Sequence, residues 1–385
     1  MTLKIFMVAG EPSGDALGAK LIDALRALSK DHIDFSGIGG EHMAARGFQS
    51  IFPFSDLAVI GPLAILYKLP HLVRRVYQTI NRAIQIKPHI VIIIDSPEFT
   101  HPIAKRIRKR YPNIPIIVYV SPTVWAWRPG RARKMRSYVD HVMALLPFEP
   151  DVYARLKGPL CTYVGHPLIE RQNWIQSLEP VKLAARLKLD PDAIPILLLP
   201  GSRESEIAQL LKVFGDTVSK LHGYGYKLEV LLPAVSHLRD KIIERTDDWP
   251  VSLHILEGET DKFTAFRLAH VALAASGTVT LELGITGTPM VVAYRVDKVA
   301  SMFRFLMTTD TVVLANLVIG ERVIPEFLQE DCHENALADA LISIIKNGPA
   351  RQAQLLALEK IADSLVVPNV TPSEKAAQII MDSIK

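Results

Sequence analysis

The feature that most constrains the fold is the stretch 194–206, where a short apolar run ends in a turn and a helical pattern begins. The run Ile194–Leu199 has the length and composition of a buried strand. It ends at Pro200 and Gly201, and a helix is expected from about Ser205. A strand, a tight turn and a helix in such close succession are typical of an α/β domain.

The turn of this unit suits an anion. The free N–H groups and the positive end of the macrodipole at a helix N-terminus attract anions, and Gly201 allows the backbone to come close. Arg203, beside Ser202 and Glu206, adds a charged fork that matches phosphate. The pattern leaves two interpretations open: a phosphate site, or an ordinary turn with an N-cap serine and a surface arginine.

Length and composition bound the class of protein. A chain of 385 residues should form about two domains, and 49% apolar with 22% charged residues is typical of globular proteins. The net charge of +4 is too small to indicate a nucleic-acid partner. Cys161 and Cys332 are far apart, which fits a reducing compartment and excludes a cysteine-based zinc site. No apolar run is long enough to span a membrane, and the apolar start is too short for a signal peptide, so we expect a cytosolic protein.

The βα pattern occurs twice along the chain. Apolar runs predict strands at 3–9, 35–38, 89–94, 114–120, 141–145 and 161–164, and again at 194–199, 227–232, 252–256, 271–275 and 289–294. The junction lies near 165–175. We therefore expect an α/β fold of two Rossmann-like, doubly wound domains, 1–168 and 169–354, that face a central cleft. The first turn reads GEPSGD, so the dinucleotide fingerprint GxGxxG is absent.

Several side chains follow the expected strands, where ligands bind in open parallel sheets. Asp95 follows the apolar run 89–94, and its alternative role is to cap the next helix. Trp125 and Trp127 lie beside Arg128, where they could stack on a sugar or base or fill a domain interface. The pattern does not separate these two alternatives.

The second half offers a constellation that would suit a nucleotide diphosphate. Ser276-Gly277-Thr278 and the turn at Gly201 provide two backbone cradles for phosphate, and Glu282 provides a carboxylate for ribose hydroxyls. HExxH, GxSxG and GKS/T are absent, which weighs against a metallohydrolase, a serine hydrolase and a P-loop NTPase.

Residues 57–76 are unusually apolar for a segment that contains Pro62 and Pro70 and ends at Arg74 and Arg75. One interpretation is a core helix with a proline break. The other is an exposed apolar patch rimmed by cations, which would contact an anionic membrane or an acyl chain.

Seven stretches, taken together and in order, resemble one known family. They are AGEPSGD (9–15), VSPTVWAWRPGR (120–131), LPFE (146–149), VGHP (164–167), LLPGSRESE (198–206), ASGTVTLE (275–282) and Asn316-Leu317. The chain resembles the lipid-A-disaccharide synthases, bacterial glycosyltransferases of family 19 with GT-B architecture. The matching stretches are spread from residue 3 to about 340.

The resemblance implies a specific reaction in lipid A biosynthesis. UDP-2,3-diacylglucosamine would donate its sugar to the 6-hydroxyl of 2,3-diacylglucosamine 1-phosphate. The products would be UDP and a β-1,6-linked disaccharide phosphate, with inversion at the anomeric carbon. Neither a metal nor another cofactor is expected, and nucleic acid is not an expected partner.

The resemblance also assigns roles to residues. Inversion needs a base for the acceptor hydroxyl, and Asp95 matches the family's acidic position, with Glu11 as the alternative. Ser13, Gly14, Trp125 and Arg128 would lie near the acceptor. The residues expected to bind the UDP moiety are Gly201, Ser202, Arg203, Glu206, Ser276, Gly277, Thr278, Glu282 and Asn316.

Because both substrates carry acyl chains, the membrane interpretation of residues 57–76 gains weight. Leu63, Ile65, Leu66 and Leu69 would hold acyl chains or enter the membrane, while Lys68, Arg74 and Arg75 would meet phosphates. The expected location is the cytoplasm, peripherally at the cytoplasmic face of the inner membrane.

Glycosyltransferases of this plan often return their last helix to the first domain, so 355–385 is assigned there and a swapped homodimer stays open. Two rival functions also remain at this point. One is a UDP-N-acetylglucosamine epimerase, and the other is a non-catalytic nucleotide-sugar-binding protein at the membrane.

Overall fold

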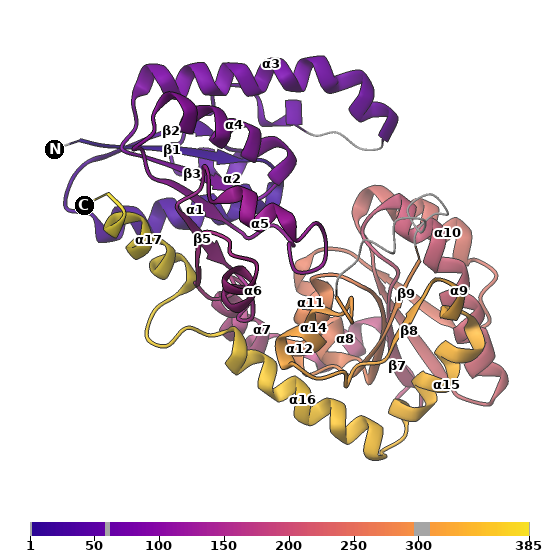
Figure 1. Ribbon diagram of the computed structural model, residues 1–385. Helices are drawn as coiled ribbons and strands as arrows, with labels where there is room; N and C mark the ends of the chain where they lie inside the picture. The colour runs from indigo at the N-terminus through magenta and orange to yellow at the C-terminus, as the bar shows by residue number, and fades with distance from the viewer. Residues whose placement is uncertain (1, 58–61, 296–308, 385) are drawn as a thin grey trace. The chain divides into compact units, whose positions relative to one another are not determined.

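The computed structural model describes residues 2–57, 62–295 and 309–384 (Figure 1), and the side chains of 62–68 lie outside this description. The chain forms two compact units. One contains Met1–Pro167 together with Val366–Lys385, and the other contains Leu168–Leu365. Each unit has its own sheet and core, and each is described by itself.

The sheet of the first unit has six strands in the order β2-β1-β3-β4-β5-β6, and all pairs are parallel. Strand β3 is wholly buried, as expected for an apolar run covered by helices on both faces. The chain order reverses between β1 and β3, which makes their carboxyl ends the switch point where such sheets bind ligands. The strands are β1 (Leu3–Ala9), β2 (Ile33–Ile38), β3 (Ile90–Ile94), β4 (Ile116–Tyr119), β5 (His141–Ala144) and β6 (Leu160–Tyr163).

Seven α-helices in the described residues belong to this unit. They are α1 (Pro12–Leu28), α2 (Glu41–Ala44), α3 (Pro62–Ile86), α4 (Pro97–Arg110), α5 (Gly130–Met135), α6 (Glu149–Arg155) and α17 (Pro372–Asp382). The last helix, α17, lies along α1 (Figure 1) and buries Ala376, Ala377 and Ile380 in the core of the first sheet. Helix α3 runs through Pro70, where the sequence predicted a break. A proline removes one hydrogen bond from a helix, and here the helix continues and packs on α4.

The sheet of the second unit has the order β12-β11-β10-β7-β8-β9, again all parallel. Counted from β7, this is the Rossmann order, and its switch point lies between β7 and β10. The strands are β7 (Ile194–Leu199), β8 (Leu228–Pro233), β9 (Ser252–Leu256), β10 (Val271–Ala275), β11 (Met290–Tyr294) and β12 (Glu326–Leu328).

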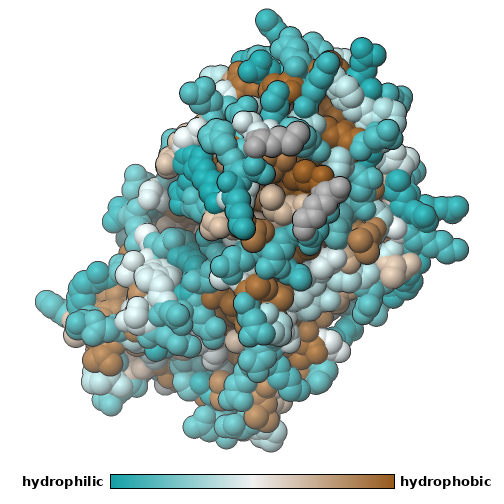
Figure 2. All heavy atoms as spheres, turned by 90° about the vertical axis from the view of Figure 1, so that its left-hand side faces the viewer, coloured by the Kyte–Doolittle hydropathy of each residue, from teal (hydrophilic) through white to brown (hydrophobic). Residues whose placement is uncertain are grey.

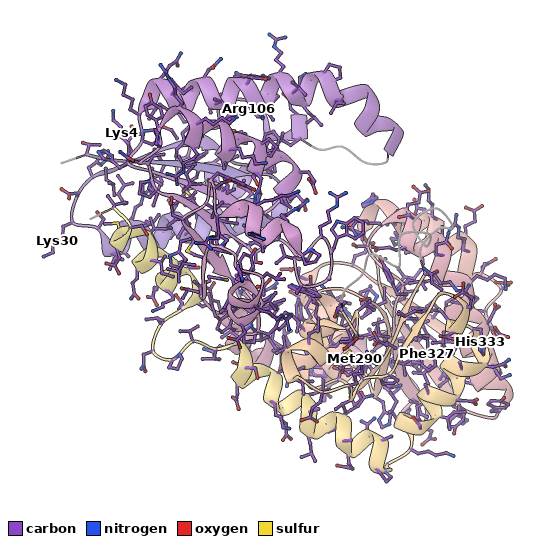
Figure 3. All side chains as sticks on the ribbon, viewed as in Figure 1. Lys4, Lys30, Arg106, Met290, Phe327 and His333 are labelled. Atoms are coloured by element: carbon purple, nitrogen blue, oxygen red, sulfur yellow. The ribbon has the colours of Figure 1, made fainter. Side chains whose placement is uncertain are left out.

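The helices of the second unit include α16, which crosses the predicted boundary at residue 354. The side-chain amide of Gln354 exchanges hydrogen bonds of 2.8 and 3.0 Å with the backbone of Met290, labelled in Figure 3, and so ties α16 to β11. Of the segment 355–385, the part up to Leu365 therefore packs here and α17 packs in the first unit. The helices are α7 (Gln172–Ser177), α8 (Pro180–Leu187), α9 (Glu204–Gly223), α10 (Arg239–Thr246), α11 (Glu259–Leu268), α12 (Val279–Thr286), α14 (Leu314–Ile319), α15 (Glu334–Ile345) and α16 (Pro349–Leu365).

Candidate functional site

Asp95 lies at the switch point of the first sheet, directly after β3, and its carboxylate is held on two sides. The hydroxyl of Ser13, in the first turn of α1, donates to one oxygen at 3.1 Å. The backbone N–H of Ser96 donates to the other at 2.7 Å. The structure thus brings together Ser13 and Asp95, which the sequence placed 82 residues apart.

The backbone around Asp95 is strained. Asp95 and Ser96 have φ angles of 55° and 44°, and Val120, at the end of neighbouring β4, has a φ of 76°. Non-glycine residues in this left-handed region are uncommon, and each costs about 1–3 kcal/mol. Such strain persists where the surrounding structure enforces it, typically at functional sites.

The two glycines of the AGEPSGD stretch let the first turn pack against this strained segment. A Cβ atom on Gly10 would lie 2.2 Å from the Cβ of Ser96. A Cβ on Gly14 would lie 3.2 Å from the carbonyl oxygen of Ile94 and 3.5 Å from the Cβ of Asp95. These positions therefore need glycine because of close approach rather than because of their own backbone angles.

The acids of the AGEPSGD stretch differ in their surroundings. Asp15 is buried and accepts hydrogen bonds from the backbone N–H groups of Gly40, His42 and Met43 at 2.7, 2.9 and 3.1 Å, so it holds α2 on α1. Glu11 is exposed at the N-cap of α1 and makes no side-chain capping bond. The Asp95 carboxylate, by comparison, is held by Ser13 and the N–H of Ser96.

The Trp125 loop is anchored by Glu149, a residue of the LPFE stretch to which the sequence assigned no role. The indole N–H of Trp125 donates to Glu149 at 3.3 Å, and the backbone N–H of Leu146 donates to the other carboxylate oxygen at 3.1 Å. Burial raises the pKa of Glu149 to about 7. Phe148 packs edge-on against the indole, with ring centroids 5.5 Å apart. The LPFE stretch thus holds this loop, and the polar edge of Trp125 is already occupied.

In the second unit, a cavity of about 780 Å³ lies at the switch point between β7 and β10. Eight of the nine residues expected at the UDP moiety line it: Gly201, Ser202, Arg203, Glu206, Ser276, Gly277, Thr278 and Glu282. The segment 233–236 and Gly258, Glu259 and Lys262 also line the cavity, and the sequence reasoning missed them. The volume is in the usual range for a small-molecule site.

The turn after β7 differs from the expected open cradle. Glu206 accepts hydrogen bonds from the backbone N–H groups of Ser202 and Arg203 at 2.9 and 3.2 Å, and from the Arg203 guanidinium at 2.9 Å. This is a capping box, in which the acid three residues into a helix binds back to its start. Glu206 therefore occupies the donors that the sequence assigned to phosphate, and an incoming phosphate must compete with it.

The turn after β10 makes different hydrogen bonds from the turn after β7. Gly277 has a φ of 151°, and α12 starts at Val279. The N–H groups of Thr280, Leu281 and Glu282 already donate to the carbonyls of Gly277 and Thr278, at 3.2, 3.0 and 3.3 Å. The hydroxyl of Ser276 donates to the carbonyl of Val312 at 2.6 Å. Glu282, expected to hold ribose, forms an ion pair with Lys262 at 2.6 Å. A single lysine on α11 carries no sequence signal for such a role.

Asn316 does not line this cavity. It is buried, and its side-chain amide exchanges hydrogen bonds of 2.9 and 3.0 Å with the backbone of Ile324. It therefore holds the segment that leads into β12. Among the described residues, no cluster of three or more His, Cys, Asp or Glu side chains could hold a metal ion.

Helix α3 carries an exposed apolar stripe, made of Leu69, Val73 and Tyr77, on one face at four-residue spacing. These side chains are 49%, 45% and 49% exposed. Arg106, labelled in Figure 3, places its guanidinium carbon 5.2 Å from the centre of the Tyr77 ring. One face of the molecule likewise shows apolar groups scattered among hydrophilic side chains (Figure 2).

Arg75, which was expected to meet phosphates, already has partners within the protein. Arg75 pairs with Asp56 and Gln78 and lies 4.7 Å from the centre of the Phe52 ring, so its charge is already used within the protein. Arg74 is exposed. The side chains of Leu63, Ile65, Leu66 and Lys68 lie outside the described residues. In the described part, no helix has the length and hydropathy needed to cross a bilayer.

Solved structures with a similar fold are remote in sequence. The UDP-GlcNAc 2-epimerase from Neisseria meningitidis bound to UDP-GlcNAc matches with a TM-score of 0.66 and 12% identity, covering 99% of each chain. MurG from Acinetobacter baumannii matches with a TM-score of 0.60 and 11% identity, again covering 99% of each chain. At these identities the similarity concerns the fold alone. It confirms the expected fold class, two Rossmann-like domains of the GT-B type.

Sequence relatives are much nearer. A model of the family described as Lipid-A-disaccharide synthetase matches residues 5–380. The lipid-A-disaccharide synthase of Rhodopseudomonas palustris (strain HaA2) is 46% identical over 99% of this chain and 96% of its own length. That of Nitrobacter winogradskyi is 48% identical over 99% of this chain and 96% of its own length. The chain therefore belongs to the lipid-A-disaccharide synthase family of glycosyltransferases.

Proposed function

We propose that the protein transfers a sugar from UDP-2,3-diacylglucosamine to the 6-hydroxyl of 2,3-diacylglucosamine 1-phosphate. The products are UDP and the β-1,6-linked disaccharide 1-phosphate of lipid A biosynthesis, and the anomeric carbon is inverted. The observation that carries the proposal is the match at 46–48% identity, over 99% of the chain, to proteins named lipid-A-disaccharide synthase.

In this proposal, the second unit binds the UDP part of the donor in the cavity between β7 and β10. Ser276, Gly277 and Thr278, in the turn that leads into α12, bind the diphosphate. Arg203, whose side chain is 76% exposed, turns from Glu206 to the phosphates and meets the charge that gathers on the departing UDP. Glu282 accepts from the ribose hydroxyls while Lys262 neutralises part of its charge.

The first unit supplies the base. Asp95 accepts the proton of the acceptor's 6-hydroxyl as that oxygen attacks the anomeric carbon from the side opposite UDP. Ser13 and the N–H of Ser96 hold the carboxylate in place, so little reorganisation is needed at the moment of transfer. Glu149 holds the Trp125 loop beside the acceptor.

A product assay tests this function. Radiolabelled UDP-diacylglucosamine and diacylglucosamine 1-phosphate are incubated with the protein and EDTA, and the lipids are separated. A labelled lipid disaccharide with equimolar UDP is expected, and NMR of the new linkage should show the β anomer. Absence of the disaccharide, with epimerisation of UDP-N-acetylglucosamine instead, would contradict the proposal.

We also propose that the protein works peripherally at the cytoplasmic face of the inner membrane, with α3 as the contact. The apolar stripe of Leu69, Val73 and Tyr77, with exposed Arg74, supports this. Replacing the three stripe residues by Ser should release the protein from anionic vesicles in a flotation assay. A matched change of exposed Val181 on α8, in the other unit, should not. Full retention of the stripe variant would refute α3 as the contact.

A further inference from the structure

A second cavity, of about 480 Å³, lies on the first unit, and Arg128 is the one residue of its walls that was given a role above. Its walls come from α4, α5 and the segments that flank α5. The volume is enough for a small polar ligand. The cavity is distinct from the one between β7 and β10, with which it shares no residue.

The walls of this cavity carry an excess of positive charge. Lys105, Arg128, Arg131 and Lys134 line it, and Glu98 is its only carboxylate. Arg131 pairs with Glu98 at 2.7 Å. Within the described ranges, the other three cations make no ion pair. Three like charges around one cavity repel each other, and an anion between them would remove that repulsion.

Aromatic rings lie beside two of these cations. The Nζ atom of Lys105 lies 5.2 Å from the centre of the Tyr138 ring, and the guanidinium of Arg128 lies 5.0 Å from the centre of the Trp127 ring. His101 is buried and its Nδ1 lies 2.9 Å from the Tyr138 hydroxyl. Burial lowers the pKa of His101 to about 4, so the ring is neutral near pH 7 and leaves the charge to the lysines and arginines.

The cavity adjoins the strained turn that carries Asp95. Pro97, His101 and Lys105 recur at four-residue spacing on α4, so one face of the helix lines the cavity from its first turn onward. Asp95 precedes Glu98 of the same wall by three residues, which limits the distance between their Cα atoms to about 10 Å. The wall of the cavity and the turn that carries Asp95 are therefore neighbours along the chain.

We propose that this cavity is a phosphomonoester subsite, in which Lys105, Arg128 and Lys134 bind the 1-phosphate of the acceptor sugar while its 6-hydroxyl lies at Asp95. A phosphomonoester carries nearly two negative charges at neutral pH and three acceptor oxygens, which match one guanidinium fork and two ammonium groups. The inference rests on the proposed function. It names the group by which the first unit recognises its substrate.

Kinetics with two acceptors test the subsite in the full-length protein. The acceptors are diacylglucosamine with and without the 1-phosphate, at saturating donor. The wild-type protein should prefer the phosphorylated acceptor. The double variant Lys105→Gln/Lys134→Gln should lower kcat/KM for that acceptor about 10- to 100-fold, mainly through KM, because two charged contacts are lost. It should leave kcat/KM for the other acceptor unchanged.

Matched variants separate the cavity from charge in general. Lys109→Gln/Arg110→Gln removes two exposed cations from the far end of α4, outside the cavity, and should keep the preference. Lys105→Arg/Lys134→Arg keeps both positive charges and should therefore keep most of the preference for the phosphorylated acceptor. Both lysines are exposed, so the melting temperature and the donor KM serve as checks on folding.

Three results would overturn the inference. One is an unchanged preference in the glutamine variant, and another is an equal loss with the control pair. The third is that the glutamine variant no longer binds phosphatidylglycerol vesicles but still prefers the phosphorylated acceptor. This result would assign the cavity to a membrane lipid headgroup. In each case the wild-type protein still forms the disaccharide, whereas no disaccharide from either acceptor would refute the proposed function itself.

Discussion

Both switch points contain residues with positive φ angles, but the types of residue differ. At the strand ends of the second unit, the positive φ angles of 120° and 151° belong to Gly201 and Gly277. At the switch point of the first unit, directly after β3, they belong to Asp95 and Ser96. Glycine adopts this region with little strain, whereas other residues cost about 1–3 kcal/mol each.

This difference indicates that the two turns have different functions. A glycine turn presents backbone N–H groups and keeps side chains away, which suits a phosphate. A strained turn keeps a carboxylate at the strand end, which suits proton transfer. We therefore expect changes in the first turn to reduce the chemical step and changes in the second turn to weaken UDP binding.

Asp95→Asn tests the first half of this comparison and should have the largest effect. The amide cannot take a proton, but it can keep its contacts with Ser13 and the N–H of Ser96. Loss of a general base should lower kcat about 10²- to 10⁴-fold. The UDP dissociation constant, measured by calorimetry, should stay within about twofold. Unchanged turnover would exclude Asp95 as the base, and Glu11→Gln would then be measured.

Glu149→Gln sharpens the comparison through pH, because a buried carboxyl holds the Trp125 loop of the first unit. Burial raises the pKa of Glu149 from 4.5 to about 7. Between these values the folded protein keeps a proton that the unfolded chain has released. Stability contributed by this group is therefore full below about pH 4.5 and is lost as the pH rises to about 7. The loss is about 3 kcal/mol at most.

Glutamine resembles the protonated carboxyl in shape and cannot ionise, so the variant should gain stability over the wild type as the pH rises from 5 to 8. The measurement is the difference between the two melting temperatures at each pH. Taking a difference is necessary because burial lowers the pKa values of His101 and His166 to about 4, which adds an opposite trend in acid. A difference that does not change with pH would contradict the raised pKa.

Arg203→Ala tests the second half of the comparison, which is that changes in the turn of the second unit weaken UDP binding. Removing the guanidinium leaves Glu206 on the N–H groups of Ser202 and Arg203, so both an attractive charge and a partner of Glu206 are lost. UDP binding should weaken about 10- to 100-fold. Lys212→Ala, on the same helix and paired with Asp216, is the matched control and should bind UDP like the wild type. Equal affinity in both variants would remove Arg203 from the donor site.

Most of the fold could be predicted because its strands are continuous apolar runs. The predicted bounds 194–199, 252–256 and 271–275 agree with the structure. Strand β12, with three half-buried residues, carries no such signal and was not predicted. The stretch 173–189 contains two helices, α7 and α8, because Pro180 starts a new one. Short elements depend on tertiary packing more than on their own pattern.

The candidate site was predictable where a motif places residues in one turn. Gly201–Arg203 and Ser276–Thr278 meet in one cavity because they follow adjacent strands. What could not be predicted is which partner each polar group takes. Glu206 satisfies the turn that looked open, Lys262 pairs with Glu282, and Glu149 holds Trp125. These pairings depend on side-chain geometry that spacing does not contain.

The smallest effect should come from relieving the strain itself, through Ser96→Gly with Lys188→Gly as its control. Both residues have left-handed backbones, with φ of 44° at the strained turn and 55° at the end of α8 in the other unit. Glycine removes the strain but loses more chain entropy on folding, so each variant should gain only about 0.5–1 kcal/mol. That gain should raise the melting temperature by a few degrees.

Turnover should separate the two variants. With glycine at position 96, the backbone that donates to Asp95 at 2.7 Å can move, and the carboxylate moves with it. A small misplacement of a catalytic group is costly, so we expect kcat to fall about tenfold in Ser96→Gly and to stay unchanged in Lys188→Gly. If both variants are more stable and both keep full activity, the strain at the first turn is incidental. If only Ser96→Gly loses activity, the strain holds the base in place, and the contrast with the glycine turns of the second unit reflects the chemistry that each turn performs.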